Sequence, residues 1–143
     1  SDGAAACLMT SRAFADKHNL PVLATVRGYV TTGVDPAIMG IGPVPAISKL
    51  LARHSLKVSD IDIFEVNEAF ASQAVYCQKE LGISDEQLNP NGGAIALGHP
   101  LGATGSRMTA TLLHEMKRRE AKLGVVSMCI GGGMGAAALF QSA

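Results

Sequence analysis

The chain has 143 residues, enough for one ordinary domain with a buried core. Its 12 basic and 12 acidic residues are interspersed and give a formal net charge of zero, which argues against a nucleic-acid or polybasic membrane partner. Three cysteines without CxxC spacing argue against a disulfide framework and favour a reducing compartment, and no apolar run approaches the ~20 residues of a membrane span.

The first half of the chain predicts short elements of both kinds. Residues 3–9 are small and apolar, and fit a buried strand or a helix equally well. Residues 11–19 are polar and predict a short helix, and the β-branched stretch 22–30 predicts a strand. A loop over 33–45 then leads into a predicted helix at 47–54.

The middle of the chain predicts a strand followed by a helix. Residues 61–66 alternate between apolar and polar, which is typical of a strand. Residues 68–81 are predicted to be helical and to end at Gly82 as a C-cap. A connection over 83–90 and a short strand at 94–97 follow.

The last third predicts one clear helix and two strands. Residues 106–120 place their apolar side chains on one helical face. The strand at 123–130 is continuously apolar, which indicates cover on both faces, and a second strand spans 134–140. Alternating strands and helices of this kind predict a layered α/β domain.

A glycine-rich run, NPNGGAIALGHPLGATGSR at residues 89–107, holds a single histidine. The glycines allow close backbone approach to a ligand, and two prolines restrict the chain between them. His99 lies in the middle of the run, and histidine is the side chain whose ordinary pKa lies nearest neutrality. His99 is therefore a candidate general acid or base, with a core or capping histidine as the alternative.

Three segments together resemble one family: Asn67-Glu-Ala-Phe-Ala71, the glycine-rich run and Cys129-Ile-Gly-Gly-Gly-Met-Gly135. In this order and spacing they are similar to the C-terminal half of thiolases, the acetyl-CoA C-acyltransferases, over essentially the whole chain. The ending GMGAAALF most resembles degradative 3-ketoacyl-CoA thiolases. The resemblance implies a mixed sheet covered by helices, as the C-terminal half of a duplicated fold.

The resemblance also implies a domain boundary. Residues 3–11 (GAAACLMTS) echo residues 135–142 (GAAALFQS). We therefore expect residues 1–10 to be the last strand of an N-terminal thiolase domain, and residues 11–143 to be the C-terminal domain. Thiolases carry their acyl-accepting cysteine in a glycine-rich motif of the N-terminal domain, and neither Cys7 nor Cys77 lies in such a motif. The chain is expected to be a fragment, inactive alone.

By the resemblance, His99 would deprotonate the absent nucleophile and help to hold one oxyanion. Cys129 would exchange a proton with the acetyl-CoA α-carbon, although a small core residue is the alternative. Asn67 would hold a water in the oxyanion hole, although on spacing alone it could cap the following helix. The backbone N–H of Gly131 would serve a second oxyanion site. Ala69 and Phe70 are expected to line the tunnel for the pantetheine of CoA, and their neighbour Glu68 to orient the loop.

Other glycine and histidine patterns do not support a different chemistry. The chain ends too soon after its GGGMGA segment for a dinucleotide-binding unit, and the glycine-rich run lacks the Gly-Lys-Ser/Thr of a phosphate loop. The other histidines have no partner at metal-ligand spacing, so no metal site is expected: His18, His54 and His114.

The leading interpretation is the catalytic C-terminal part of a 3-ketoacyl-CoA thiolase, which needs acyl-CoA and CoA as substrates and no cofactor. The alternatives are a biosynthetic acetoacetyl-CoA thiolase and an inactive CoA-binding or assembly module. The family resemblance implies an N-terminal half as partner and a homodimer or homotetramer. The compartment is expected to be the cytoplasm or the matrix of a peroxisome or mitochondrion.

Overall fold

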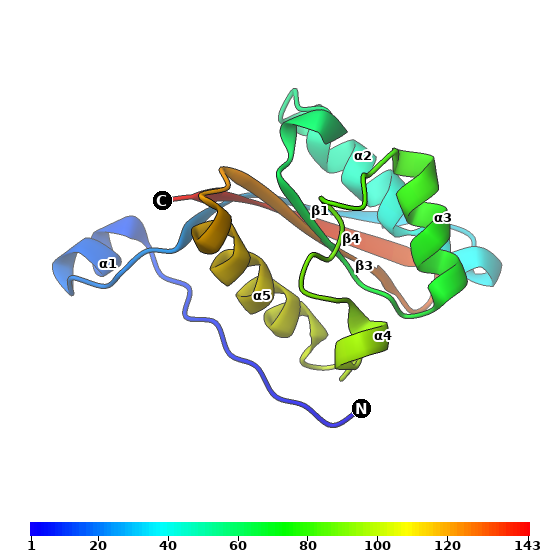
Figure 1. Ribbon diagram of the computed structural model, residues 1–143, viewed down its shortest axis with the longest axis horizontal. Coiled ribbons are helices and arrows are strands. Elements are labelled where there is room, and N and C mark those ends of the chain that lie inside the picture. Colours follow the sequence, from blue (N-terminus) through cyan, green and yellow to red (C-terminus); the bar gives the residue numbers. More distant parts are fainter.

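The structure, a computed structural model, describes residues 1–143 as one mixed sheet between two layers of helix (Figure 1). The strand order is β1-β4-β3-β2, in which only β2 and β3 pair in parallel. The elements are α1 (Arg12–Lys17), β1 (Ala24–Gly33), the 3-10 helix η1 (Pro36–Ile41), α2 (Pro43–Arg53), the 3-10 helix η2 (Val58–Asp60), β2 (Ile63–Val66), α3 (Ala71–Leu81), α4 (Ala94–Leu97), α5 (Thr104–Arg119), β3 (Leu123–Ile130) and β4 (Met134–Ser142).

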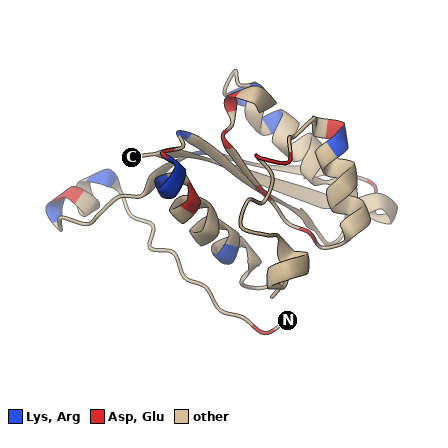
Figure 2. Ribbon diagram, in the orientation of Figure 1, with Lys and Arg blue, Asp and Glu red and all other residues tan.

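Two hydrophobic cores lie on opposite faces of the sheet. The larger packs α2 and Cys77 of α3 against one face, and the smaller packs α5 against the other. Successive residues of β3 point to different cores, since Val125 belongs to the first and Val126 to the second. The prediction that this strand is covered on both faces is therefore confirmed, as is the layered fold with a mixed sheet. Charged residues of both signs lie along the helices, whereas the N-terminal arm carries only Asp2 (Figure 2).

The turn between β3 and β4 requires glycine. Gly132 and Gly133 have φ of 84° and 85°, in the left-handed region that favours residues without a β-carbon. Two residues further on, a β-carbon on Gly135 would collide with the carbonyl of Gly42, just before α2. The glycines of this segment thus let β4 pack directly against the backbone that leads into α2.

Several predicted elements differ in the structure. Residues 94–97 form the helical turn α4 instead of a strand, because a short apolar run has too few residues to distinguish the two periods. The segment that pairs beside β2 is 87–89, in the predicted connection, where Leu88 bridges to Phe64. The predicted loop 33–45 contains η1 and the beginning of α2.

Residues 1–10 form an exposed arm that passes α5 without joining the sheet (Figure 1). The first residue of the arm contacts the glycine-rich loop, since Ser1 Oγ accepts a hydrogen bond from the His99 N–H at 3.3 Å. The strand expected here is not formed in this structure. Its assignment to an N-terminal domain stays a prediction.

Candidate active site

The candidate residues gather where the parallel strands β2 and β3 end. Parallel strands carry their ligand sites at the carboxyl edge of the sheet. The backbone N–H of Asn67, directly after β2, donates to the Ser127 carbonyl of β3 at 2.9 Å. From Ser127 the strand runs on through Cys129 to the glycine turn. The motif segments that begin at Asn67 and at Cys129 therefore both lie at the carboxyl edge of the sheet.

His99 lies between two polar side chains. The Asn67 amide Nδ2 lies 3.3 Å from His99 Nε2, and His99 Nδ1 lies 2.7 Å from Thr104 Oγ1. The Thr104 hydroxyl donates its one proton to the Pro100 carbonyl at 3.0 Å, so it accepts from Nδ1. Nδ1 consequently carries the ring proton, and Nε2 keeps its lone pair towards Asn67. This tautomer is the one that a general base at Nε2 requires.

Asn67 does not cap a helix. Helix α3 begins at Ala71, its N-cap is Phe70, and no side chain caps it. The Asn67 side chain is 1% exposed and points instead to His99. The helix-cap alternative is therefore wrong.

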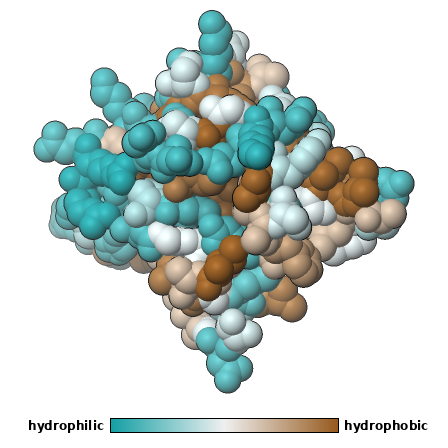
Figure 3. Space-filling view, turned by 45° about the vertical axis from the view of Figure 1, so that its right-hand side comes forward, coloured by the Kyte–Doolittle hydropathy of each residue, from teal (hydrophilic) through white to brown (hydrophobic).

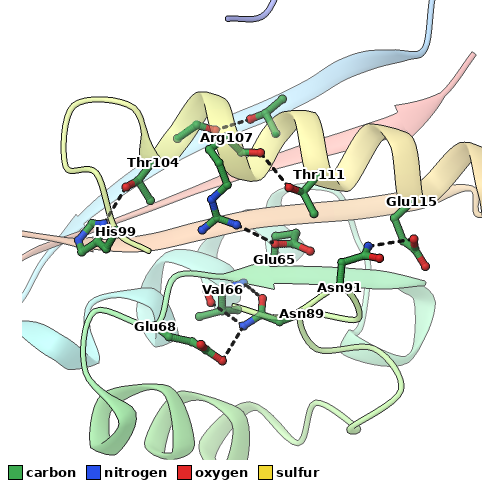
Figure 4. Close-up of polar contacts among 12 residues, drawn as sticks. Glu65, Val66, Glu68, Asn89, Asn91, His99, Thr104, Arg107, Thr111 and Glu115 are labelled. Atoms are coloured by element: carbon green, nitrogen blue, oxygen red, sulfur yellow. Dashed lines mark hydrogen bonds and ion pairs between the residues drawn. The ribbon is translucent and has the colours of Figure 1, made fainter. Parts of the chain in front are cut away.

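The glycine-rich loop is attached to the sheet by Asn89. Its side chain accepts from the Val66 N–H and donates to the Val66 carbonyl, both at 2.9 Å, as a strand backbone would (Figure 4). Further along, Asn91 donates to Glu115 of α5 at 2.9 Å. The start of the glycine-rich loop is therefore held to β2 by Asn89 and to α5 by Asn91, ahead of His99.

Glu68 connects the same loop to the end of β2. Its Oε2 accepts from the Ile95 N–H in α4 at 3.0 Å. Its Oε1 accepts from Asn89 Nδ2 at 3.3 Å (Figure 4). The expected helix at 68–81 starts three residues late, since residues 68–70 form the loop that presents this carboxylate.

Cys129 lies near the end of β3 and Gly131 directly after it, and neither makes a hydrogen bond to Asn67 or His99. Cys129 is half-buried and pairs with Gly135 of β4, and burial raises the pKa of its thiol. Gly131 is exposed, and no atom lies within 4 Å of where its β-carbon would be. Cys77 is buried and Cys7 is exposed, and neither adjoins a glycine turn.

The proposed tunnel residues lie on the loop between β2 and α3. Ala69 is half-buried, whereas the Phe70 side chain is 59% exposed. Further hydrophobic side chains are exposed on α4 and on the loop after it, namely Ile95, Leu97 and Leu101. Figure 3 shows hydrophobic side chains in separate groups on one face of the molecule.

Glu65 is a buried carboxylate that sequence analysis did not single out. It is 1% exposed, faces α5 and lies 3.9 Å from Arg107 Nη1 (Figure 4). Burial raises its pKa to about 7, while Arg107 acts in the opposite direction. The alternation of residues 61–66 places Glu65 on the same strand face as the apolar Ile63. This pattern could have predicted that Glu65 is buried. Thr104 gave no such signal, because its contact depends on the turn at Pro100.

No group of three or more His, Cys, Asp or Glu side chains is arranged to hold a metal ion. None of the helices is both long and apolar enough to cross a membrane.

Residues 20–142 match the family model described as thiolase, C-terminal domain. A peroxisomal 3-ketoacyl-CoA thiolase B of Mus musculus is 61% identical over 142 residues, which are 99% of this chain and 34% of the mouse protein. The crystal structure of human mitochondrial 3-ketoacyl-CoA thiolase in complex with CoA is 53% identical with a TM-score of 0.90, and the similarity covers 93% of this chain and 34% of the human one.

The dimeric peroxisomal thiolase of Saccharomyces cerevisiae is 57% identical with a TM-score of 0.87, over 92% of this chain and 33% of the yeast one. Another structure of the yeast enzyme is described as built from two core domains of identical topology. The chain spans about a third of the length of the curated relatives that it matches.

Proposed function

The chain belongs to the thiolase family, and we propose that it supplies one half of the active site of a degradative 3-ketoacyl-CoA thiolase. The observation that carries the proposal is the contact between Asn67 and His99, with Nδ1 of His99 held by Thr104. The substrates are a 3-ketoacyl-CoA and CoA. The names of the relatives support the degradative direction.

In the proposed mechanism, His99 takes the proton of a cysteine supplied by an N-terminal thiolase half. The thiolate attacks the C3 carbonyl of the substrate, and the C2–C3 bond breaks. The leaving enolate of acetyl-CoA takes a proton at C2 from Cys129. Cys129 then accepts the thiol proton of an incoming CoA, whose sulfur attacks the acyl-cysteine and releases the shortened acyl-CoA.

Two oxyanion sites would stabilise the charge that forms in these steps. His99 and a water held by Asn67 form the first, and the N–H of Gly131 with that of the nucleophile forms the second. The exposure of Gly131 supports this role. Ala69 and Phe70 line the path of the pantetheine, since they lie in the loop directly after Asn67.

The assembly we propose contains an N-terminal thiolase half, with residues 1–10 as its last strand and residues 11–143 as the C-terminal domain. The complete enzyme is a homodimer or homotetramer, which the dimeric yeast relative supports. It works in the matrix of a peroxisome or mitochondrion, the compartments named for the relatives.

A chimera tests the proposal: the N-terminal part of the mouse relative is joined to this chain in place of its own C-terminal third. The chimera should cleave a 3-ketoacyl-CoA with CoA. His99→Ala should abolish this activity, whereas the matched change His114→Ala, at an exposed position of α5, should leave it unchanged. Near-normal thiolysis by the His99→Ala chimera would contradict the assignment. A preference for condensing two acetyl-CoA would favour the biosynthetic alternative.

A further inference from the structure

We propose that Glu68 is a positioning residue that holds His99 against Asn67 by fixing the glycine-rich loop to the end of β2. The inference rests on the proposed function of His99 for its catalytic consequence. The geometry on which it is based is independent of that function.

Glu68 provides a second connection between Asn67 and His99. It follows Asn67 directly in the chain, and its carboxylate reaches across to the Ile95 N–H at 3.0 Å. Ile95 lies four residues, about one helical turn, before His99. Asn67 is therefore linked to the histidine loop by its own 3.3 Å contact and by the side chain of its neighbour.

The second oxygen of Glu68 binds a side chain that is itself fixed. Asn89 uses its Oδ1 and one Nδ2 proton on the Val66 backbone, and its remaining Nδ2 proton points to Glu68 Oε1 at 3.3 Å. Every hydrogen-bonding atom of the Asn89 side chain is thus used. Glutamine could not accept at both positions, because its amide nitrogen only donates.

Gly93 supplies independent evidence that the carboxylate is built into the loop. A β-carbon on Gly93 would collide with the carboxylate carbon and both oxygens of Glu68, and these are its nearest neighbours. The backbone itself would permit a side chain, since Gly93 has φ of −96°. An alanine at this position would therefore force the Glu68 carboxylate to move, although the backbone conformation would accept it.

The first test reads the His99 ring directly, by nitrogen NMR of the 143-residue chain. The parent should show His99 fixed with the proton on Nδ1. Glu68→Ala should shift the His99 signals towards a mixture of tautomers, and Glu68→Gln should shift them less. The signals of His54 and His114 report whether the rest of the fold is intact. Glu80→Ala, at an exposed position of α3, is the matched control and should leave His99 unchanged.

The second test is a double-mutant cycle in the chimera. Gly93→Ala should lower kcat by up to ~10²-fold, the scale of a small displacement of a catalytic group. The Glu68→Ala chimera should itself have a reduced kcat. In that background, Gly93→Ala should lower kcat by less than about twofold, because the new β-carbon no longer meets the Glu68 carboxylate. KM should change less than kcat, since the pantetheine residues are untouched.

Unchanged His99 signals in both Glu68 variants, or equal costs of Gly93→Ala in the two backgrounds, would overturn the inference. Failure of the proposed function has a different signature. In that case, the parent chimera is inactive while the His99 signals still respond to Glu68→Ala.

Discussion

The buried carboxylate of Glu65 makes a specific prediction about stability and pH. The pKa of this group rises from 4.5 to about 7 on folding, chiefly because the folded chain removes it from water. Arg107 lowers the pKa, and the charges of Glu115 and Glu68 raise it. Between pH 4.5 and about 7 the unfolded chain has lost this proton while the folded chain keeps it. Glu65 therefore makes the free energy of unfolding fall as the pH rises through this window.

The magnitude follows from the two pKa values. Each pKa unit corresponds to ~1.4 kcal/mol, so Glu65 contributes a loss of up to ~3 kcal/mol between pH 4.5 and pH 8. Glu65→Gln removes the ionisation and keeps the shape. Relative to the parent, the variant should gain up to ~3 kcal/mol over this range, as measured by urea unfolding of the chain at four pH values.

The other carboxylates are present in both proteins, so their contribution to the pH dependence of the free energy of unfolding cancels when the variant is compared with the parent. Glu80→Gln, at an exposed position of α3, should follow the parent. If Glu65→Gln shows the same pH dependence as the parent, Glu65 is not held protonated by burial and the reasoning is wrong.

Three further substitutions test other parts of the account. Thr104→Val removes the acceptor of the His99 Nδ1 proton and should lower kcat of the chimera roughly 10-fold, the scale of one hydrogen bond, whereas Thr104→Ser should restore it. Asn67→Ala should slow turnover by ~10²–10³, as for other oxyanion donors; unfolding with little kinetic effect would instead indicate a packing role. Gly135→Ala should destabilise the chain by ~1–3 kcal/mol in urea unfolding because its β-carbon meets the backbone before α2. The control Gly33→Ala, where no atom lies within 4 Å, should not, and equal costs would refute the packing argument.

Long, strongly patterned segments were predicted well from the sequence. The largely apolar stretch 123–130 forms β3 with the predicted bounds, because both faces of the strand are covered and its one polar residue, Ser127, donates to the Ala136 carbonyl of β4. The short run 94–97 was predicted wrongly as a strand, since four residues complete barely one helical turn. The pairing of 87–89 beside β2 was not predicted, because the side chain of Asn89 supplies part of the ladder.

Some residues of the site were also identified from the sequence, and others were not. Asn67 and His99 were identified from motifs, and the structure brings their side chains together. Thr104 was not identified, because its contact with His99 depends on the turn at Pro100. The buried Glu65 was not identified, because its neighbour Arg107 depends on how α5 lies against β2. Periodicity places a residue on a face, but it does not say which side chain of another element lies opposite. Glu68 was expected only to orient the loop, and its contacts now name the atoms involved.

The central claim is that this chain holds the base and the second acid/base of a thiolase, while the nucleophile comes from another segment. Its most direct test is thiolysis of a 3-ketoacyl-CoA by the purified chain, with intact mass recorded on the same sample, before and after an N-terminal thiolase half is added. The account predicts no turnover and no acyl adduct at 14.8 kDa, and turnover when the other half is present. Thiolysis by the chain alone at that mass would contradict it and would make Cys7, Cys77 or Cys129 the nucleophile.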